Sequence, residues 1–123
     1  MLSNKKLVAF VATTNQAKSK SFYQGILGLT LLSEDNFALV FDANGTVLRV
    51  SSVREFQPCP FTVLGWETND IEADIRSLNA KGVYFEKYGF FEQDDIGIWM
   101  APGGAKIAWF KDTDGNTLSL TQH

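Results

Sequence analysis

Residues 109–120 read WFKDTDGNTLSL, and this stretch has the pattern of a β-hairpin. The residues up to Phe110 predict one strand, Asp114-Gly115 predicts a tight turn in which glycine tolerates a positive φ, and residues 116–120 predict the returning strand. The first half of the chain contains an echo of this stretch, because residues 41–50 read FDANGTVLRV. The acidic residue, the turn and the returning strand recur at a constant offset of 70 positions. A repeated turn followed by a repeated strand predicts a duplicated module.

A strand and a helix are predicted before each hairpin. Residues 6–13 form an apolar, strand-like run, after which Asn15 is placed to cap an amphipathic helix. Residues 61–67 predict the corresponding strand of the second half, and Asp70 is placed to cap its helix. The two caps differ by 55 positions whereas the hairpins differ by 70, so the second module carries about 15 extra residues, which we place at 90–104. Each module therefore reads as a strand, a helix and three strands.

Length and composition indicate one small globular domain. The chain has 123 residues, of which 45% are hydrophobic, so that two short modules are expected to share one core. We expect a single domain over residues 1–123, with the first module at about 5–55, a linker at 56–60 and the second module at about 61–121.

Charge and hydropathy exclude several classes of partner. A net charge of −3 and dispersed lysines give no basic face, so no nucleic-acid partner is expected. No apolar run approaches the length of a membrane span and no secretory signal is recognisable, so no membrane partner is expected. Cys59 is the only cysteine and allows no disulfide within the chain, which is compatible with a cytoplasmic location.

Four stretches of the chain carry a resemblance to a known family. They are LVAFVATTNQAKSKSFYQGILGL, FDANGTVLRV, FTVLGWETNDIEADIRSLNAKGVYF and WFKDTDGNTLSL. Together they resemble the vicinal oxygen chelate superfamily, which contains glyoxalase I, extradiol dioxygenases, fosfomycin-resistance enzymes and bleomycin resistance proteins. The resemblance extends from about residue 6 to residue 121. It implies an α+β fold in which two βαβββ modules in tandem form curled mixed sheets around a cleft, and it implies a homodimer.

In the metal-dependent members of this family, four side chains from the cleft strands hold a divalent ion. By resemblance, the corresponding positions here are Val8, Arg49, Val63 and Ser119. Two are aliphatic, one is a weakly donating hydroxyl, and an arginine would repel a cation. The remaining donors are the only histidine, His123, and a small acidic cluster in the insertion, made of Glu92, Asp94 and Asp95. We therefore expect no metal and no other cofactor, and we assign no catalytic residue.

The cleft is expected to be suited to a small organic molecule. Side chains alternate along a strand, so residues that share parity with these four positions should face the cleft, and they are a mixture of aliphatic, aromatic, hydroxyl and charged groups. Arg49 suits a carboxylate or phosphate, or alternatively an internal salt bridge with Glu67. Trp99 either contacts the ligand or packs against the sheet. The predicted ligand-binding residues are Phe10, Arg49, Glu67, Trp99 and Ser119.

Three functions follow from these patterns. The first is metal-free binding of a small anionic or aromatic molecule, with sequestration of a toxic compound as one version. The alternative is an enzyme of the superfamily, a lyase, isomerase or dioxygenase, that uses an atypical metal site or metal-free acid/base chemistry through Glu67. The third is a structural or regulatory dimer with a vestigial cleft.

Overall fold

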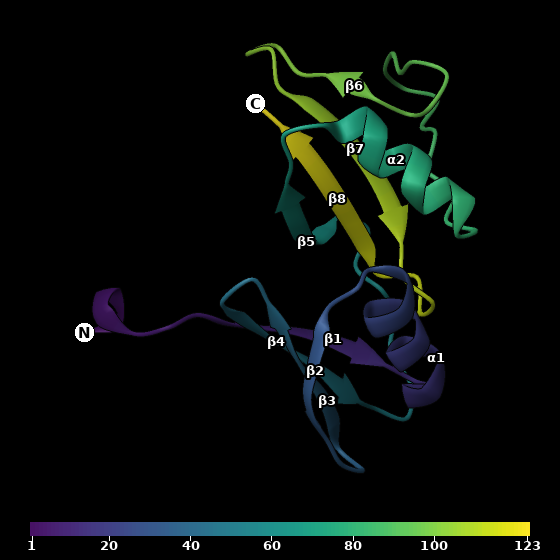
Figure 1. Ribbon diagram of the computed structural model, residues 1–123. Coiled ribbons are helices and arrows are strands. Elements are labelled where there is room, and N and C mark those ends of the chain that lie inside the picture. Colours follow the sequence, from purple (N-terminus) through teal and green to yellow (C-terminus); the bar gives the residue numbers. More distant parts are fainter. The chain divides into compact units, whose positions relative to one another are not determined.

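The computed structural model describes residues 1–123, which form two compact units, Met1–Gln57 and Pro58–His123. Each unit contains an open four-stranded sheet and one α-helix (Figure 1). Both sheets are mixed, with one parallel and two antiparallel pairs. The predicted α+β fold of two βαβββ modules in tandem is confirmed. None of the helices combines the length and the apolar character that crossing a bilayer requires.

The first unit has its strands in the order β1-β4-β3-β2, and β1 runs parallel to β4. Asn15 caps the helix as predicted, because its side chain accepts a hydrogen bond from the Lys18 backbone N–H. The helical segment is less regular than predicted, since its second half is a π-helix. The elements are η1 (Leu2–Asn4), β1 (Val8–Thr13), α1 (Gln16–Lys20), the π-helical η2 (Ser21–Ile26), β2 (Thr30–Glu34), β3 (Ala38–Ala43) and β4 (Thr46–Ser52).

The second unit repeats this arrangement with the order β5-β8-β7-β6, and β5 runs parallel to β8. Asp70 caps its helix by accepting a hydrogen bond from the Ala73 backbone N–H. The predicted insertion at 90–104 contains only one short strand. The elements are β5 (Thr62–Glu67), α2 (Ile71–Ala80), β6 (Trp99–Met100), β7 (Lys106–Lys111) and β8 (Thr117–Gln122).

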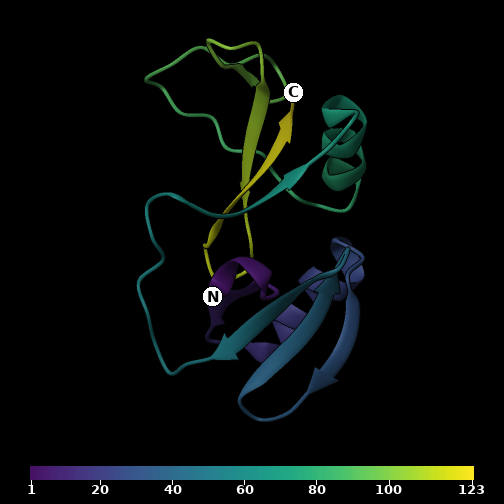
Figure 2. The ribbon, with the colours of Figure 1, turned by 90° about the vertical axis from the view of Figure 1, so that its left-hand side faces the viewer.

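Each sheet buries the face that packs against its helix, and we call the opposite face the open face, where Thr117 and Ser119 of the second sheet are nevertheless buried. In the first unit the alternate residues Phe41, Leu48 and Val50 are buried, and the ring of Phe41 lies 5.9 Å from that of Tyr23 in η2. In the second unit, the buried face of β7 and β8 is apolar and α2 contributes Ile71 and Ile75 to the core. Figure 2 shows α2 on one side of the second sheet and the green segment that follows α2 on the other side. The open faces are therefore the places where side chains are free to take other roles.

The two hairpins differ more than their sequences indicate. Ala43 pairs with Thr46 across the two-residue turn Asn44-Gly45, in which both residues have positive φ. In the second hairpin Lys111 pairs with Thr117, so the loop has five residues and the structural match before the turn is shifted by one position. The loop is longer because Asp112 accepts hydrogen bonds from the backbone N–H groups of Asp114 and Asn116.

Candidate ligand-binding site

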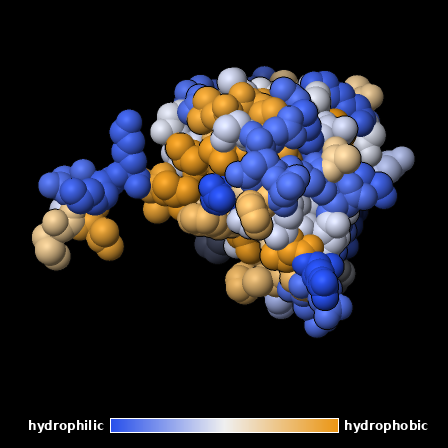
Figure 3. Space-filling view, turned by 90° about the horizontal axis from the view of Figure 1, so that it is seen from below, coloured by the Kyte–Doolittle hydropathy of each residue, from blue (hydrophilic) through white to orange (hydrophobic).

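Two of the predicted site residues are neighbours on the open face of the first sheet. The parallel register places Phe10 of β1 opposite Arg49 of β4, and Val8 opposite Val47. Phe10 is 62% exposed, although it lies in the middle of a strand. Exposed hydrophobic residues of this kind appear as orange areas where the extended N-terminal arm joins the rest of the surface (Figure 3). An exposed aromatic ring beside a guanidinium group is a combination that is typical of binding surfaces.

Asp35 lies within the electrostatic reach of Arg49. Hydrogen bonds from the Phe37 and Ala38 backbone N–H groups lower the pKa of the Asp35 carboxyl, desolvation opposes this effect, and the Arg49 charge adds a smaller lowering. The Asp35 carboxylate is thus held mainly by the turn that follows it.

Ser119 lies on the open face of the second sheet, directly opposite Gly65 of β5. A Cβ atom at position 65 would come within 2.8 Å of the Ser119 Oγ atom, so the hydroxyl occupies space that only glycine leaves free. Val63 differs from the expectation, because the register shifts between Thr62 and Leu64 and Val63 is the extra residue of a β-bulge. The bulge brings Thr62, instead of Val63, opposite Thr117 on this face.

Five aromatic rings form a connected cluster on the same face, which we call the aromatic cluster. Phe91 contacts the four other rings, and Trp109, which contacts three of them, pairs with Ser119 across β7 and β8. Ring centroids within the cluster are separated by 4.7 to 6.0 Å, and the Trp109 indole N–H donates a hydrogen bond of 3.1 Å to Thr62. The members are Tyr88, Phe90, Phe91, Trp99 and Trp109. Such edge-to-face and tilted contacts give a rigid apolar surface.

Sequence reasoning identified Trp99 but missed Trp109 and Tyr88 as site residues. Trp109 shares strand parity with Ile107 and lies opposite Ser119, so alternation along β7 was the signal that pointed to it. No such alternation points to Tyr88, because it lies outside the strands and the path of residues 83–98 decides where its ring lies.

A hollow of about 400 Å³ lies beside the aromatic cluster, at the hairpin end of the second sheet. Its polar lining includes Lys111 and Thr117, which are paired across β7 and β8. Burial, followed by the charge of Glu86, raises the pKa of the Tyr88 phenol, so this hydroxyl stays protonated and can donate. The lining residues are Pro58, Cys59, Pro60, Tyr88, Lys111, Gly115 and Thr117. We call this space the hairpin hollow.

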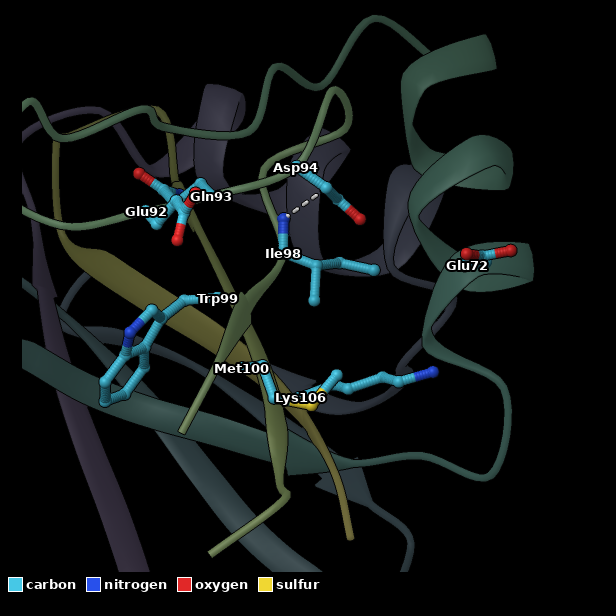
Figure 4. Close-up of a pocket in the computed structure, with 8 residues that line it drawn as sticks. All are labelled: Glu72, Glu92, Gln93, Asp94, Ile98, Trp99, Met100 and Lys106. Carbon is cyan, nitrogen blue, oxygen red and sulfur yellow. Dashed lines mark hydrogen bonds between the residues drawn. The ribbon is translucent and has the colours of Figure 1, made fainter. Parts of the chain in front are cut away.

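A second groove, of about 500 Å³, lies on the helix side of the sheet and is drawn in Figure 4. Glu92 and Asp94 line it, but Asp94 is occupied in holding its own loop, since it accepts a hydrogen bond of 2.8 Å from the Ile98 N–H. The Trp99 ring points away from Glu72 in this view, toward the open face (Figure 4). The groove residues are Glu72, Glu92, Gln93, Asp94, Ile98, Trp99, Met100 and Lys106.

Glu67, the remaining predicted residue, lies at the end of β5 and is exposed. Its carboxylate is 3.4 Å from the Nε2 atom of His123, and both residues line a polar hollow with Thr68, Asn69 and Gln122. The only histidine of the chain is therefore placed beside a carboxylate, which its position at the C-terminus did not indicate.

The residues at the family's metal positions do not fit a metal ion. Val8 and Val63 have no lone pair to donate, Arg49 is a cation, and Ser119 is a neutral hydroxyl. Nowhere in residues 1–123 do three side chains of His, Cys, Asp or Glu come together in an arrangement that could hold a metal.

Comparisons with known proteins agree with the fold and with one another. The profile of the Glyoxalase/Bleomycin resistance protein/Dioxygenase superfamily matches residues 7–120. No curated protein matches the chain in sequence. A glyoxalase family protein from Bacillus anthracis is similar in structure, with a TM-score of 0.78, 12% identity, and coverage of 98% of this chain and 95% of that one.

Two further structures have more specific descriptions. TnmS3, an antibiotic binding protein from Streptomyces sp. CB03234, has a TM-score of 0.73 and 24% identity, with coverage of 99% of this chain and 98% of its own. Lactoylglutathione lyase from Agrobacterium tumefaciens has a TM-score of 0.74 and 10% identity, with coverage of 97% and 93%. At these identities the likeness shows the fold alone. The structures that share this fold include both a binding protein and an enzyme.

Proposed function

Because this chain belongs to the Glyoxalase/Bleomycin resistance protein/Dioxygenase superfamily, we propose that it binds a small organic molecule with aromatic character on the open face of its second sheet. Binding without a metal is the form that the four replaced ligand positions favour. Sequestration of a toxic compound is the physiological version that we propose.

The aromatic cluster is the observation that carries this proposal. Five rings lie on the sheet face that α2 leaves free, and Phe90 is 81% exposed. Large apolar rings on an uncovered face cost free energy in water, and a flat aromatic ligand would recover part of it by stacking. The hydroxyl of Ser119 lies beside the cluster, and a few polar groups among apolar ones are typical of ligand pockets.

The fold similarity to an antibiotic binding protein supports binding as a role for this architecture. The similarity to a lyase supports the enzyme alternative equally at the level of fold, so chemistry has to be measured.

Binding is testable with a panel of fused-ring aromatic compounds, by isothermal titration calorimetry. We expect saturable binding by the wild type, and a loss of about fivefold in affinity for Trp109→Leu, since an aromatic contact contributes about 1 kcal/mol. Trp66→Leu is the matched control, because Trp66 pairs with Leu120 on the helix side of the same sheet. No binding across the panel, or equal losses in both variants, would contradict the proposal, and conversion of a compound into product would favour the enzyme.

Arg49 has its own test on the first sheet. The sequence-based prediction is that Arg49→Ala abolishes binding of an anionic ligand. Arg54→Ala, at an exposed residue outside the strands, is the matched control and should bind as the wild type does. Unchanged affinity in Arg49→Ala would reject the role of Arg49.

We also propose that the chain acts as a homodimer in the cytoplasm. Apolar side chains of the N-terminal segment, among them Leu2, Leu7 and Phe10, are exposed in the single chain, and a second copy would cover them. The exposed free thiol of Cys59 is compatible with a reducing compartment. Light scattering after size exclusion should give twice the 13.7 kDa mass of one chain. A mass of one chain at micromolar concentration would contradict the dimer.

A further inference from the structure

The hairpin hollow is lined by side chains that can donate hydrogen bonds to a ligand. Thr117 lines the hollow, is 7% exposed, and is paired with Lys111 across β7 and β8. A hydroxyl can donate one hydrogen bond, so an oxygen atom of a ligand in the hollow can accept from Thr117. The hollow is therefore a place where a polar ligand group is stabilised.

Lys111 gives the hollow a positive charge. Its ammonium group is 3.9 Å from the Glu86 carboxylate, at the outer limit of an ion pair. Such a contact is weak, and the ammonium has three donors, so it retains donors for a ligand. The chain as a whole has a net charge of −3, and a local cation is what an anionic ligand needs to approach it.

Tyr88 connects the hollow to the aromatic cluster. It lines the hollow, and its ring lies 5.6 Å from that of Trp109 and 5.8 Å from that of Phe91. A molecule that occupies both spaces must carry its polar group next to a flat ring. The acidic groove on the helix side, with Glu72, Glu92 and Asp94, would repel the same molecule.

We propose that the hairpin hollow binds the carboxylate of a small aromatic acid through Lys111 and Thr117, while the ring of the acid lies against Tyr88 and Trp109. This assignment rests on the proposed function, and it names the class of ligand. It competes with the sequence-based prediction that Arg49 binds the anionic group.

The test compares a fluorinated naphthoate with the corresponding naphthamide by ligand-observed fluorine NMR. The two probes have the same ring and differ in charge. We expect the wild type to bind the acid about tenfold more tightly than the amide, since hydrogen bonds to a charged group contribute about 1.5 to 3 kcal/mol. Lys111→Met and Thr117→Val should each weaken the affinity for the acid by about fivefold or more, and should leave the affinity for the amide within about twofold of the wild-type value.

Lys106→Met is the matched control. Lys106 lies on the same strand, β7, but lines the groove on the helix side, so its loss removes the same charge without touching the hollow. Affinities of both probes should be within about twofold of the wild type in this variant.

Each contrary result has a distinct meaning. Equal affinities for acid and amide would overturn the carboxylate assignment and leave aromatic binding standing. Loss of acid preference in Arg49→Ala, but not in Lys111→Met, would move the anion site to the first sheet and overturn this inference. Binding of neither probe would overturn the inference, and failure of the wider aromatic panel would be needed to overturn the proposed function.

Discussion

Replacing Asp112 by alanine should destabilise the protein far more than replacing the acidic residue of the first hairpin, Asp42. The Asp112 carboxylate accepts hydrogen bonds of 2.9 Å from the Asp114 and Asn116 backbone N–H groups, and one of 2.8 Å from the Asn116 side chain. Asp112 and Asn116 are both buried. Asp42 accepts one hydrogen bond of 2.9 Å, from the exposed Gly45 N–H.

The difference in magnitude follows from burial. Removing the Asp112 carboxylate leaves donors of Asn116 unsatisfied in a buried loop, which costs about 1 to 3 kcal/mol each, and we expect a total of about 3 to 5 kcal/mol. In Asp42→Ala the freed Gly45 N–H turns to water, so the expected cost is about 1 kcal/mol or less.

Urea denaturation followed by circular dichroism measures both free energies of unfolding. Asp112→Asn is a useful third variant, since its side-chain oxygen still accepts from the backbone and should recover more than half of the loss. Equal destabilisation by Asp112→Ala and Asp42→Ala would refute the reasoning, because it would mean that the loop does not depend on its buried hydrogen bonds.

Three further predictions concern single side chains. Gly65→Ala should weaken both folding and binding of an aromatic ligand, because the new Cβ would lie 2.8 Å from the Ser119 Oγ atom; Ser119→Ala in the same chain should restore stability in a thermal melt. Asp70→Ala should lower the free energy of unfolding by about 1 kcal/mol through loss of the α2 cap, as measured in urea. The pKa of Asp35 is lowered mainly by backbone hydrogen bonds, so the ionised carboxylate stabilises the folded protein fully above the ordinary pKa of 3.8, and this stabilisation is lost as the pH falls through the lower pKa of the folded state. In acid titrations of stability, Asp35→Asn should reduce this loss.

The elements that sequence reasoning predicted well depend on local chemistry. The caps at Asn15 and Asp70 and the Asn44-Gly45 turn are set by a side chain and its nearest backbone groups. The π-helix after Lys20, in which Phe22 and Tyr23 are buried, carries no such signal, because no side chain in its sequence SFYQGI distinguishes a π-helix from an α-helix.

The candidate site was predictable only in part, because it depends on contacts between distant segments. Trp99 stood out by composition, whereas Tyr88, Lys111 and Thr117 come together through the register of β7 with β8 and the return of the chain after α2. The bulge at Val63 also has no local signature, since a run of apolar residues is compatible with either register. The extra residue of the bulge, Val63, places Thr62 opposite Thr117.

The two modules, superposed by their strand pairing, show where this chain has changed its chemistry. On the helix side, Phe41 and Leu48 of the first hairpin correspond to Phe110 and Leu118 of the second, and all four are buried apolar residues. On the open side, the matched positions differ in chemical class. They are Val40 and Trp109, Asp42 and Lys111, Val47 and Thr117, and Arg49 and Ser119. Packing against a helix constrains the first set to apolar residues, while the second set faces away from the helix. Trp109 packs within the aromatic cluster of the second module, whereas the reversal of charge from Asp42 to Lys111 is a change that packing does not require, and binding of an anionic molecule would account for it.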